Sequence, residues 1–112
     1  MAHSASYLDD AVVQHFISDL LPRLRAQWAA EHVILYGSRA RGEPDQWSDL
    51  DVVVVSPRFQ SIRFIDRWPQ LFRALGSPVE LEPLCYTPEE FEAKRQEPGV
   101  VHTACEEGIW LL

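Results

Sequence analysis

The chain has 112 residues, which is enough for one hydrophobic core and leaves no room for a second. Hydrophobic residues make up 46% of it, which argues against disorder, and the formal charge of −7 disfavours non-specific binding of DNA or RNA. No apolar run is long enough to span a membrane, no secretion signal opens the chain, and the two cysteines are widely spaced. We therefore expect one cytoplasmic domain over residues 1–112, with a helical segment at 1–30 and a core at 31–112, that binds neither extended nucleic acid nor a membrane.

An apolar stripe near the N-terminus predicts a helix over residues 9–30, because its members recur at steps of three and four residues. Pro22 falls inside the stripe, so we expect the helix to kink or split there. A first strand is predicted directly afterwards, at residues 32–36, and the helix is expected to cover its sheet. The stripe consists of Val13, Phe16, Ile17, Leu20, Leu24 and Trp28.

The first strand stops abruptly at Gly37 and Ser38. Glycine lets the backbone turn sharply and come close to a ligand, and serine is a good helix N-cap. We therefore expect a short helix from Ser38 whose free N–H groups face the turn. Arg39 and Arg41 fall in its first turn, where they can clamp phosphate oxygens, although an exposed salt bridge explains Arg41 equally well.

Two acidic residues, Asp49 and Asp51, open the second predicted strand at residues 49–55, which continues with four valines. Alternate side chains of a strand leave the same face, so the two carboxylates point the same way, about 7 Å apart. At that distance they repel by about 2.5 kcal/mol for an effective dielectric constant of about 20. A cation offsets this cost, and hard oxygen ligands suit Mg²⁺ or Mn²⁺. A nucleoside triphosphate with its metal ion would bind both features, its phosphates at the turn after the first strand and its metal ion at the carboxylates of the second. The alternative interpretation of Asp49 and Asp51 is a solvated strand start beside a turn, without a ligand.

A second helix is expected over about residues 61–75, with a kink or break at Pro69. Residues 79–86 predict a third strand, in which Glu80 and Glu82 share one face. Pro83 indicates that this strand lies at the edge of the sheet or contains a bulge.

A capping box predicts that the next helix begins at Pro88 and ends before Pro98. A last helix follows over residues 100–107, closed by Gly108. The four C-terminal residues are either a strand or an apolar tail docked on a partner. Together the elements predict an α/β (α+β) domain in which helices pack on a mixed β-sheet of three to four strands.

One combination of residues is specific: Gly37-Ser38, then ten residues, then Asp49-x-Asp51, between two apolar strands. It resembles the defining motif of the DNA polymerase β-like nucleotidyltransferases. The sequence GSRARG followed by SDLD resembles that of the small stand-alone members called minimal nucleotidyltransferases. The resemblance covers roughly residues 33–112.

The resemblance implies a site with two metal ions, Mg²⁺ or Mn²⁺, and ATP or another nucleoside triphosphate as substrate. Asp49 and Asp51 would bind metal as catalytic residues, and Gly37, Ser38, Arg39 and Arg41 would bind the nucleotide. A third carboxylate is implied five residues before the capping box, at Glu82, as metal ligand and general base, with Glu80 as the fallback. The family usually has aspartate there, so glutamate is a departure.

The resemblance also implies a partner, because minimal nucleotidyltransferases commonly act as antitoxins beside a helical HEPN-domain toxin and add AMP to it. We accordingly expect transfer of an NMP, AMP from ATP in the first instance, to a hydroxyl of such a partner, with a homo- or hetero-oligomer as a further option. Two alternatives stay open: a nucleotide-binding module that masks a HEPN partner by contact, and a small-molecule nucleotidyltransferase of the antibiotic-modifying type.

Overall fold

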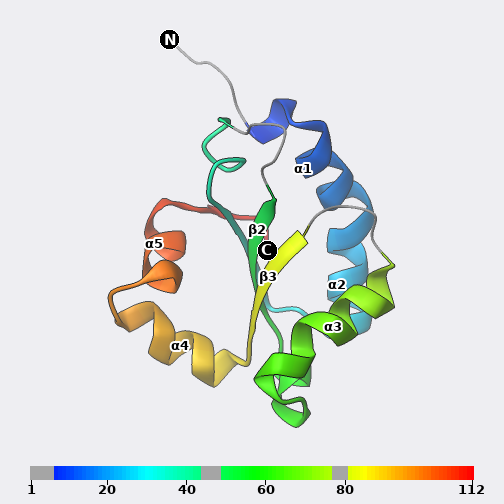
Figure 1. Ribbon diagram of the computed structural model, residues 1–112, viewed down its shortest axis with the longest axis vertical. Coiled ribbons are helices and arrows are strands. Elements are labelled where there is room, and N and C mark those ends of the chain that lie inside the picture. The colour runs from blue at the N-terminus through cyan, green and yellow to red at the C-terminus, as the bar shows by residue number, and fades with distance from the viewer. Residues whose placement is uncertain (1–6, 44–48, 77–80) are drawn as a thin grey trace.

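The computed structural model describes residues 7–43, 49–76 and 81–112, and its centre is a four-stranded sheet (Figure 1). The strands are β1 (His32–Tyr36), β2 (Leu50–Val55), β3 (Leu81–Tyr86) and β4 (Ile109–Trp110). They lie in the order β3-β2-β1-β4, with β2 antiparallel to β1 but parallel to β3, and with β4 antiparallel to β1. The expected mixed sheet of an α+β domain is confirmed.

The strand predictions agree with these bounds closely. β1 has the predicted limits, and β2 begins one residue after Asp49. The predicted start of the third strand at residue 79 and the fallback carboxylate Glu80 lie outside the described residues. β3 is an edge strand, as Pro83 indicated, and the C-terminal residues form a strand beside β1 rather than a tail on a partner.

Helices cover both faces of the sheet (Figure 1). Because side chains alternate along a strand, Val33, Leu35 and Val52 pack toward the N-terminal helices and α3, whereas Ile34 and Val53 pack toward α4 and α5. Each face therefore has its own buried apolar cluster. The helices are α1 (Ala11–His15), α2 (Leu21–Trp28), α3 (Phe64–Leu75), α4 (Pro88–Gln96) and α5 (Val100–Glu107), with helical turns η1 (Tyr7–Asp9), η2 (Phe16–Leu20) and η3 (Pro57–Ser61).

The N-terminal helix neither breaks nor ends at Pro22. Instead, η2 widens to a π turn between α1 and α2, in which the Leu21 N–H donates to the carbonyl of Phe16. Proline has no N–H to donate, and a π turn shifts the hydrogen-bonding register so that Pro22 falls in the first turn of α2. Ala29, with φ of 50°, ends the helix in the left-handed conformation.

A kink or a break was predicted at Pro69. The break is wrong, because α3 continues through Pro69 without interruption. The carbonyl that loses its donor belongs to Ile65, a residue that is 70% exposed, so water can replace the missing bond. The helix begins at Phe64 rather than near residue 61, since the chain first forms η3, capped by the hydroxyl of Ser56.

The C-terminal helices match their sequence signals. Thr87 and Glu90 form the predicted capping box at the start of α4. α5 has the predicted limits, and the N–H of Gly108 donates to the carbonyl of Ala104 at its end. In the described part of the chain, every helix is too short or too polar to cross a bilayer.

Candidate functional site

Three side chains line up across the sheet where β1 ends and β2 and β3 begin. Asp51 is the register partner of Tyr36 on one side and of Glu82 on the other. All three point to the face that carries Ile34 and Val53, because residues two apart in a strand share a face. This row lies beyond the apolar cluster that α4 and α5 bury.

The acidic groups of this row form one negative cluster together with Asp49. Burial, and then the charge of Asp49, raise the pKa of Asp51. The charge of Asp49 is the largest cause that raises the pKa of Glu82, followed by burial and by Asp51. Burial raises the pKa of Tyr36 to about 12, and Asp51 and Glu82 add to that effect. The carboxylates of Asp51 and Glu82 therefore each lie in the negative field of their acidic neighbours.

The donor chemistry of this cluster suits a hard divalent cation, because carboxylate oxygens are what Mg²⁺ and Mn²⁺ prefer. Within residues 7–43, 49–76 and 81–112, no group of three His, Cys, Asp or Glu side chains is placed to hold a metal ion. Mg²⁺ does not require such a group, because it commonly binds through one or two carboxylates, with water and substrate phosphates completing its shell.

Gly37 brings the turn after β1 against the carboxylates. Its φ is +80°, and a Cβ added there would come within 2.5 Å of Oδ2 of Asp51. A side chain at this position would therefore be strained and would displace the carboxylate. The glycine is required both for the turn and for the close approach of backbone and acid.

The helix expected from Ser38 is not formed; residues 38–42 make irregular hydrogen-bonded turns. The N–H of Arg41 donates to the carbonyl of Gly37 at 3.2 Å, and that of Glu43 to the carbonyl of Ser38 at 2.9 Å. These bonds span four and five residues, so they do not repeat as a helix does. Gly42, with φ of 72°, turns the chain away after a single loop.

The two arginines predicted to bind phosphate are in different situations. Nη1 of Arg39 donates to Oδ2 of Asp10 at 2.7 Å, and both side chains are nearly buried, at 12% and 7% exposure. Arg41 is 64% exposed and lies 3.4 Å from Glu43 in a surface ion pair. Arg39 thus fastens the turn to the start of α1, while Arg41 is accessible to a ligand.

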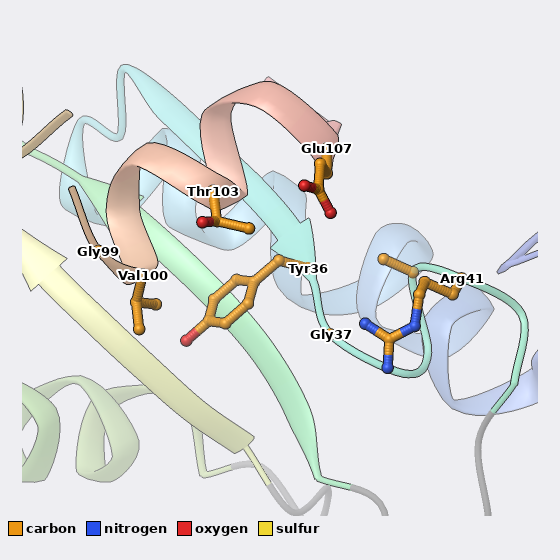
Figure 2. Close-up of a pocket in the computed structure, with 9 residues that line it drawn as sticks. Tyr36, Gly37, Arg41, Gly99, Val100, Thr103 and Glu107 are labelled. Atoms are coloured by element: carbon orange, nitrogen blue, oxygen red, sulfur yellow. The ribbon is translucent and has the colours of Figure 1, made fainter. Parts of the chain in front are cut away.

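A cavity of about 430 Å³ opens beside the turn. Figure 2 shows Tyr36 and Arg41 reaching it from the end of β1 and the turn, and Thr103 and Glu107 from α5. The α5 residues of this cavity were not predicted from the sequence. Their spacing marks one side of a helix, but only the pairing of β4 with β1 brings that side over Gly37. The lining residues are Tyr36, Gly37, Ala40, Arg41, Gly99, Val100, Thr103, Glu107 and Gly108.

A sheet-end carboxylate cluster facing a glycine turn is an arrangement suited to phosphoryl-transfer chemistry. The sequence profile of the nucleotidyltransferase domain matches residues 17–111, and the chain belongs to this family of transferases. No curated protein sequence matches the chain significantly. The fold is similar to a crystal structure from Sulfolobus solfataricus described as a "putative nucleotidyltransferase", with a TM-score of 0.57 and 16% identity over 80% of this chain and 82% of that one.

Proposed function

We propose that this chain transfers a nucleotidyl group, AMP from ATP in the first instance, to a hydroxyl of a partner protein in a reaction that depends on Mg²⁺ or Mn²⁺. The observation that carries the proposal is the cluster of Asp49, Asp51 and Glu82 beside the turn at Gly37. Membership of the nucleotidyltransferase family supports the reaction class.

The turn and the acids have separate tasks in this proposal. Gly37, Ser38 and Arg41 hold the β- and γ-phosphates, and Asp49 and Asp51 hold the divalent ion or ions. A bound divalent ion supplies charge neutralisation and Lewis acidity at the phosphates. Arg39 was predicted to contact phosphate, but its bond to Asp10 supports a positioning role.

Glu82 has the properties of a general base. Its side chain is exposed on the edge strand and its register partner is Asp51, so it lies where an acceptor hydroxyl would approach the phosphates. It takes the proton of the acceptor hydroxyl while the oxygen forms a bond to the α-phosphorus. The bond from the α-phosphorus to the bridging oxygen breaks, and pyrophosphate leaves.

The acceptor is proposed to be a protein, in line with the resemblance to HEPN-associated minimal nucleotidyltransferases. Exposed apolar side chains on α3, at Phe64, Ile65 and Phe72, support a protein contact. The edge of β3 is poorly suited to add a further strand, because Pro83 has no N–H and Nη1 of Arg67 binds the carbonyl of Cys85. A helical partner that packs beside α3 fits this surface better.

The test is incubation of the chain with ATP labelled at the α-phosphate, Mg²⁺ and the product of the neighbouring gene. The wild type is expected to label the partner, and the Asp49→Ala, Asp51→Ala variant is not. Glu92→Ala, which removes an exposed acid of α4 outside both the cluster and the α3 surface, is the matched control and should retain labelling. Labelling that persists in the double variant would refute the assigned site.

The same variants separate catalysis from masking. If the partner is a toxin, an enzyme predicts that the double variant no longer neutralises it. Neutralisation at wild-type strength by the double variant, without labelling, would instead identify a module that acts by contact.

A further inference from the structure

The cavity beside Gly37 combines an apolar wall with two opposite charges. Ala40, Gly99 and Val100 supply small or apolar surface, Arg41 supplies a cation, and Glu107 supplies an anion. Its volume of about 430 Å³ falls in the range of about 300–1,000 Å³ that small-molecule sites occupy. A ligand that matches it has flat apolar faces, an anionic part and hydrogen-bond donors.

The α5 side of the cavity is held rigidly by the fold. Val101 and Ala104 are buried in the cluster on this face of the sheet, at 5% and 1% exposure. Val100, Thr103 and Glu107 follow at steps of three and four residues, so they form one stripe along the cavity (Figure 2). Val100 remains 55% exposed, which leaves apolar surface that a ligand in the cavity would cover.

The cavity is continuous with the site of the proposed function through shared residues. Gly37 lines the cavity and also lies beside Asp51, whose carboxylate an added Cβ would meet. Tyr36 also lines it, and the charges of Asp51 and Glu82 help to raise the pKa of the Tyr36 hydroxyl. A triphosphate seated on the turn therefore has this cavity as the adjoining space.

We propose that the cavity receives the nucleoside part of the nucleotide, with the base in contact with the α5 stripe and Glu107 as the residue that selects it. This inference rests on the proposed function. An ionised carboxylate only accepts hydrogen bonds, so Glu107 favours bases with an amino group, namely adenine, cytosine or guanine. Uracil presents carbonyl oxygens on both sides of its one N–H and is disfavoured. Arg41, on the turn, faces the phosphate end of the same ligand.

The experiment measures dissociation constants for the α,β-methylene analogues of the four nucleoside triphosphates with Mg²⁺, and for inorganic tripolyphosphate as a probe without a base. Wild type is expected to bind the ATP analogue about tenfold more tightly than the UTP analogue, because one hydrogen bond to a charged group accounts for a difference of about that size. Glu107→Ala should reduce this ratio to within about twofold without changing tripolyphosphate binding. Glu106→Ala, the adjacent exposed acid on α5, is the matched control and should leave the ratio intact.

A second variant tests the cavity itself. Thr103→Trp fills it from an exposed helix position and should weaken all four analogues about tenfold, while tripolyphosphate binding stays unchanged. An unchanged base preference in Glu107→Ala, or an equal loss of tripolyphosphate binding, would overturn the inference and leave the proposed function standing. A wild type that binds neither the analogues nor tripolyphosphate would overturn both.

Discussion

Gly37 is the residue at which backbone geometry and acid chemistry meet. Gly37→Ala adds a Cβ within 2.5 Å of the Asp51 carboxylate at a φ of +80°, so we expect nucleotidyl transfer to fall by about 100-fold. Gly76→Ala is a matched control, because Gly76 also has a positive φ, +57°, but has nothing within 4 Å of the added atom. It should lose about 1 kcal/mol of stability and retain transfer. Equal loss of activity in both variants would contradict the role of close approach.

Asp51 is expected to reduce stability when it is ionised, because burial and Asp49 raise its folded-state pKa. Its contribution to stability is fully present below the unfolded pKa and is lost as the pH rises through the raised folded pKa. Asp51→Asn should therefore raise the unfolding temperature at pH 7, and raise it less at pH 4, in the absence of divalent ions. Thermal unfolding between pH 4 and 8 checks this, and a lower Tm for the variant at pH 7 would count against it.

At the scale of elements, the pair of Asp10 and Arg39 joins the N-terminal helix to the turn. Asp10 also caps α1 by accepting from the N–H groups of Val12 and Val13. Asp10→Asn keeps a good cap but removes the charge, so the turn is no longer fixed by an ion pair. We expect KM for the nucleotide to rise about tenfold while kcat changes little.

The control for this prediction is Asp9→Asn, at the exposed neighbouring position. It should leave both kinetic parameters unchanged. If Arg39 bound phosphate directly, Asp10→Asn would leave KM unchanged or lower it, which would exclude the positioning role.

Arg67 joins three elements from within the protein. Its side chain is 6% exposed; it donates to the carbonyls of Ile62 and Cys85 and pairs with both oxygens of Glu90. Arg67→Ala leaves these groups without their partner, so we expect a loss of about 3 kcal/mol in the free energy of unfolding. Arg63→Ala removes a surface pair with Asp66 and should cost no more than about 0.5 kcal/mol.

The same pair predicts a pH effect. The hydrogen bond from Arg67 lowers the pKa of Glu90, so the stability it supplies is present above the unfolded pKa and is lost as the pH falls through the folded one. Denaturant unfolding should show an acid-induced loss in wild type that is smaller in Arg67→Ala. An equal acid-induced loss of stability in wild type and Arg67→Ala would show that the Arg67–Glu90 pair is not its cause.

The sequence predicted elements well where local signals were strong. The valines of β2, the capping box at Thr87 and Gly108 after α5 each specify a boundary through nearby residues. The sequence-based predictions were wrong where the structure of a segment depended on solvent exposure or on a residue beyond the motif. Exposure of Ile65 tolerates Pro69 within α3, and the left-handed Gly42 stops a helix after Ser38.

The site was predictable on one side only. Strand alternation predicted that Asp49 and Asp51 share a face, and the family resemblance pointed to Glu82, which the register places beside Asp51. Glu107 and Thr103 were not predicted, since nothing local says which strand the end of α5 lies against. The burial of Arg39 against Asp10, 29 residues away, was equally beyond local patterns.

At the scale of the whole molecule, the two faces of the sheet have different roles. The N-terminal helices and α3 close one face with a continuous apolar cluster, while the smaller cluster under α4 and α5 does not include Asp51 or Glu82. These carboxylates, the turn at Gly37 and the cavity beside it lie at the same end of the sheet. Phe64 and Ile65 of the proposed partner surface lie beside β3, where Phe64 contacts Tyr86. The cavity instead lies between the turn at Gly37 and α5, so partner contact and nucleotide binding need not compete.

The central claim is that the acids at the start of β2 bind a nucleoside triphosphate through a divalent ion. Calorimetric titration of wild type with the α,β-methylene analogue of ATP, with Mg²⁺ and then with EDTA, tests it most directly. We predict binding with Mg²⁺, and at least a 100-fold loss both with EDTA and in the Asp49→Asn, Asp51→Asn variant. Binding of equal strength without the ion, or in the double variant, would contradict the account.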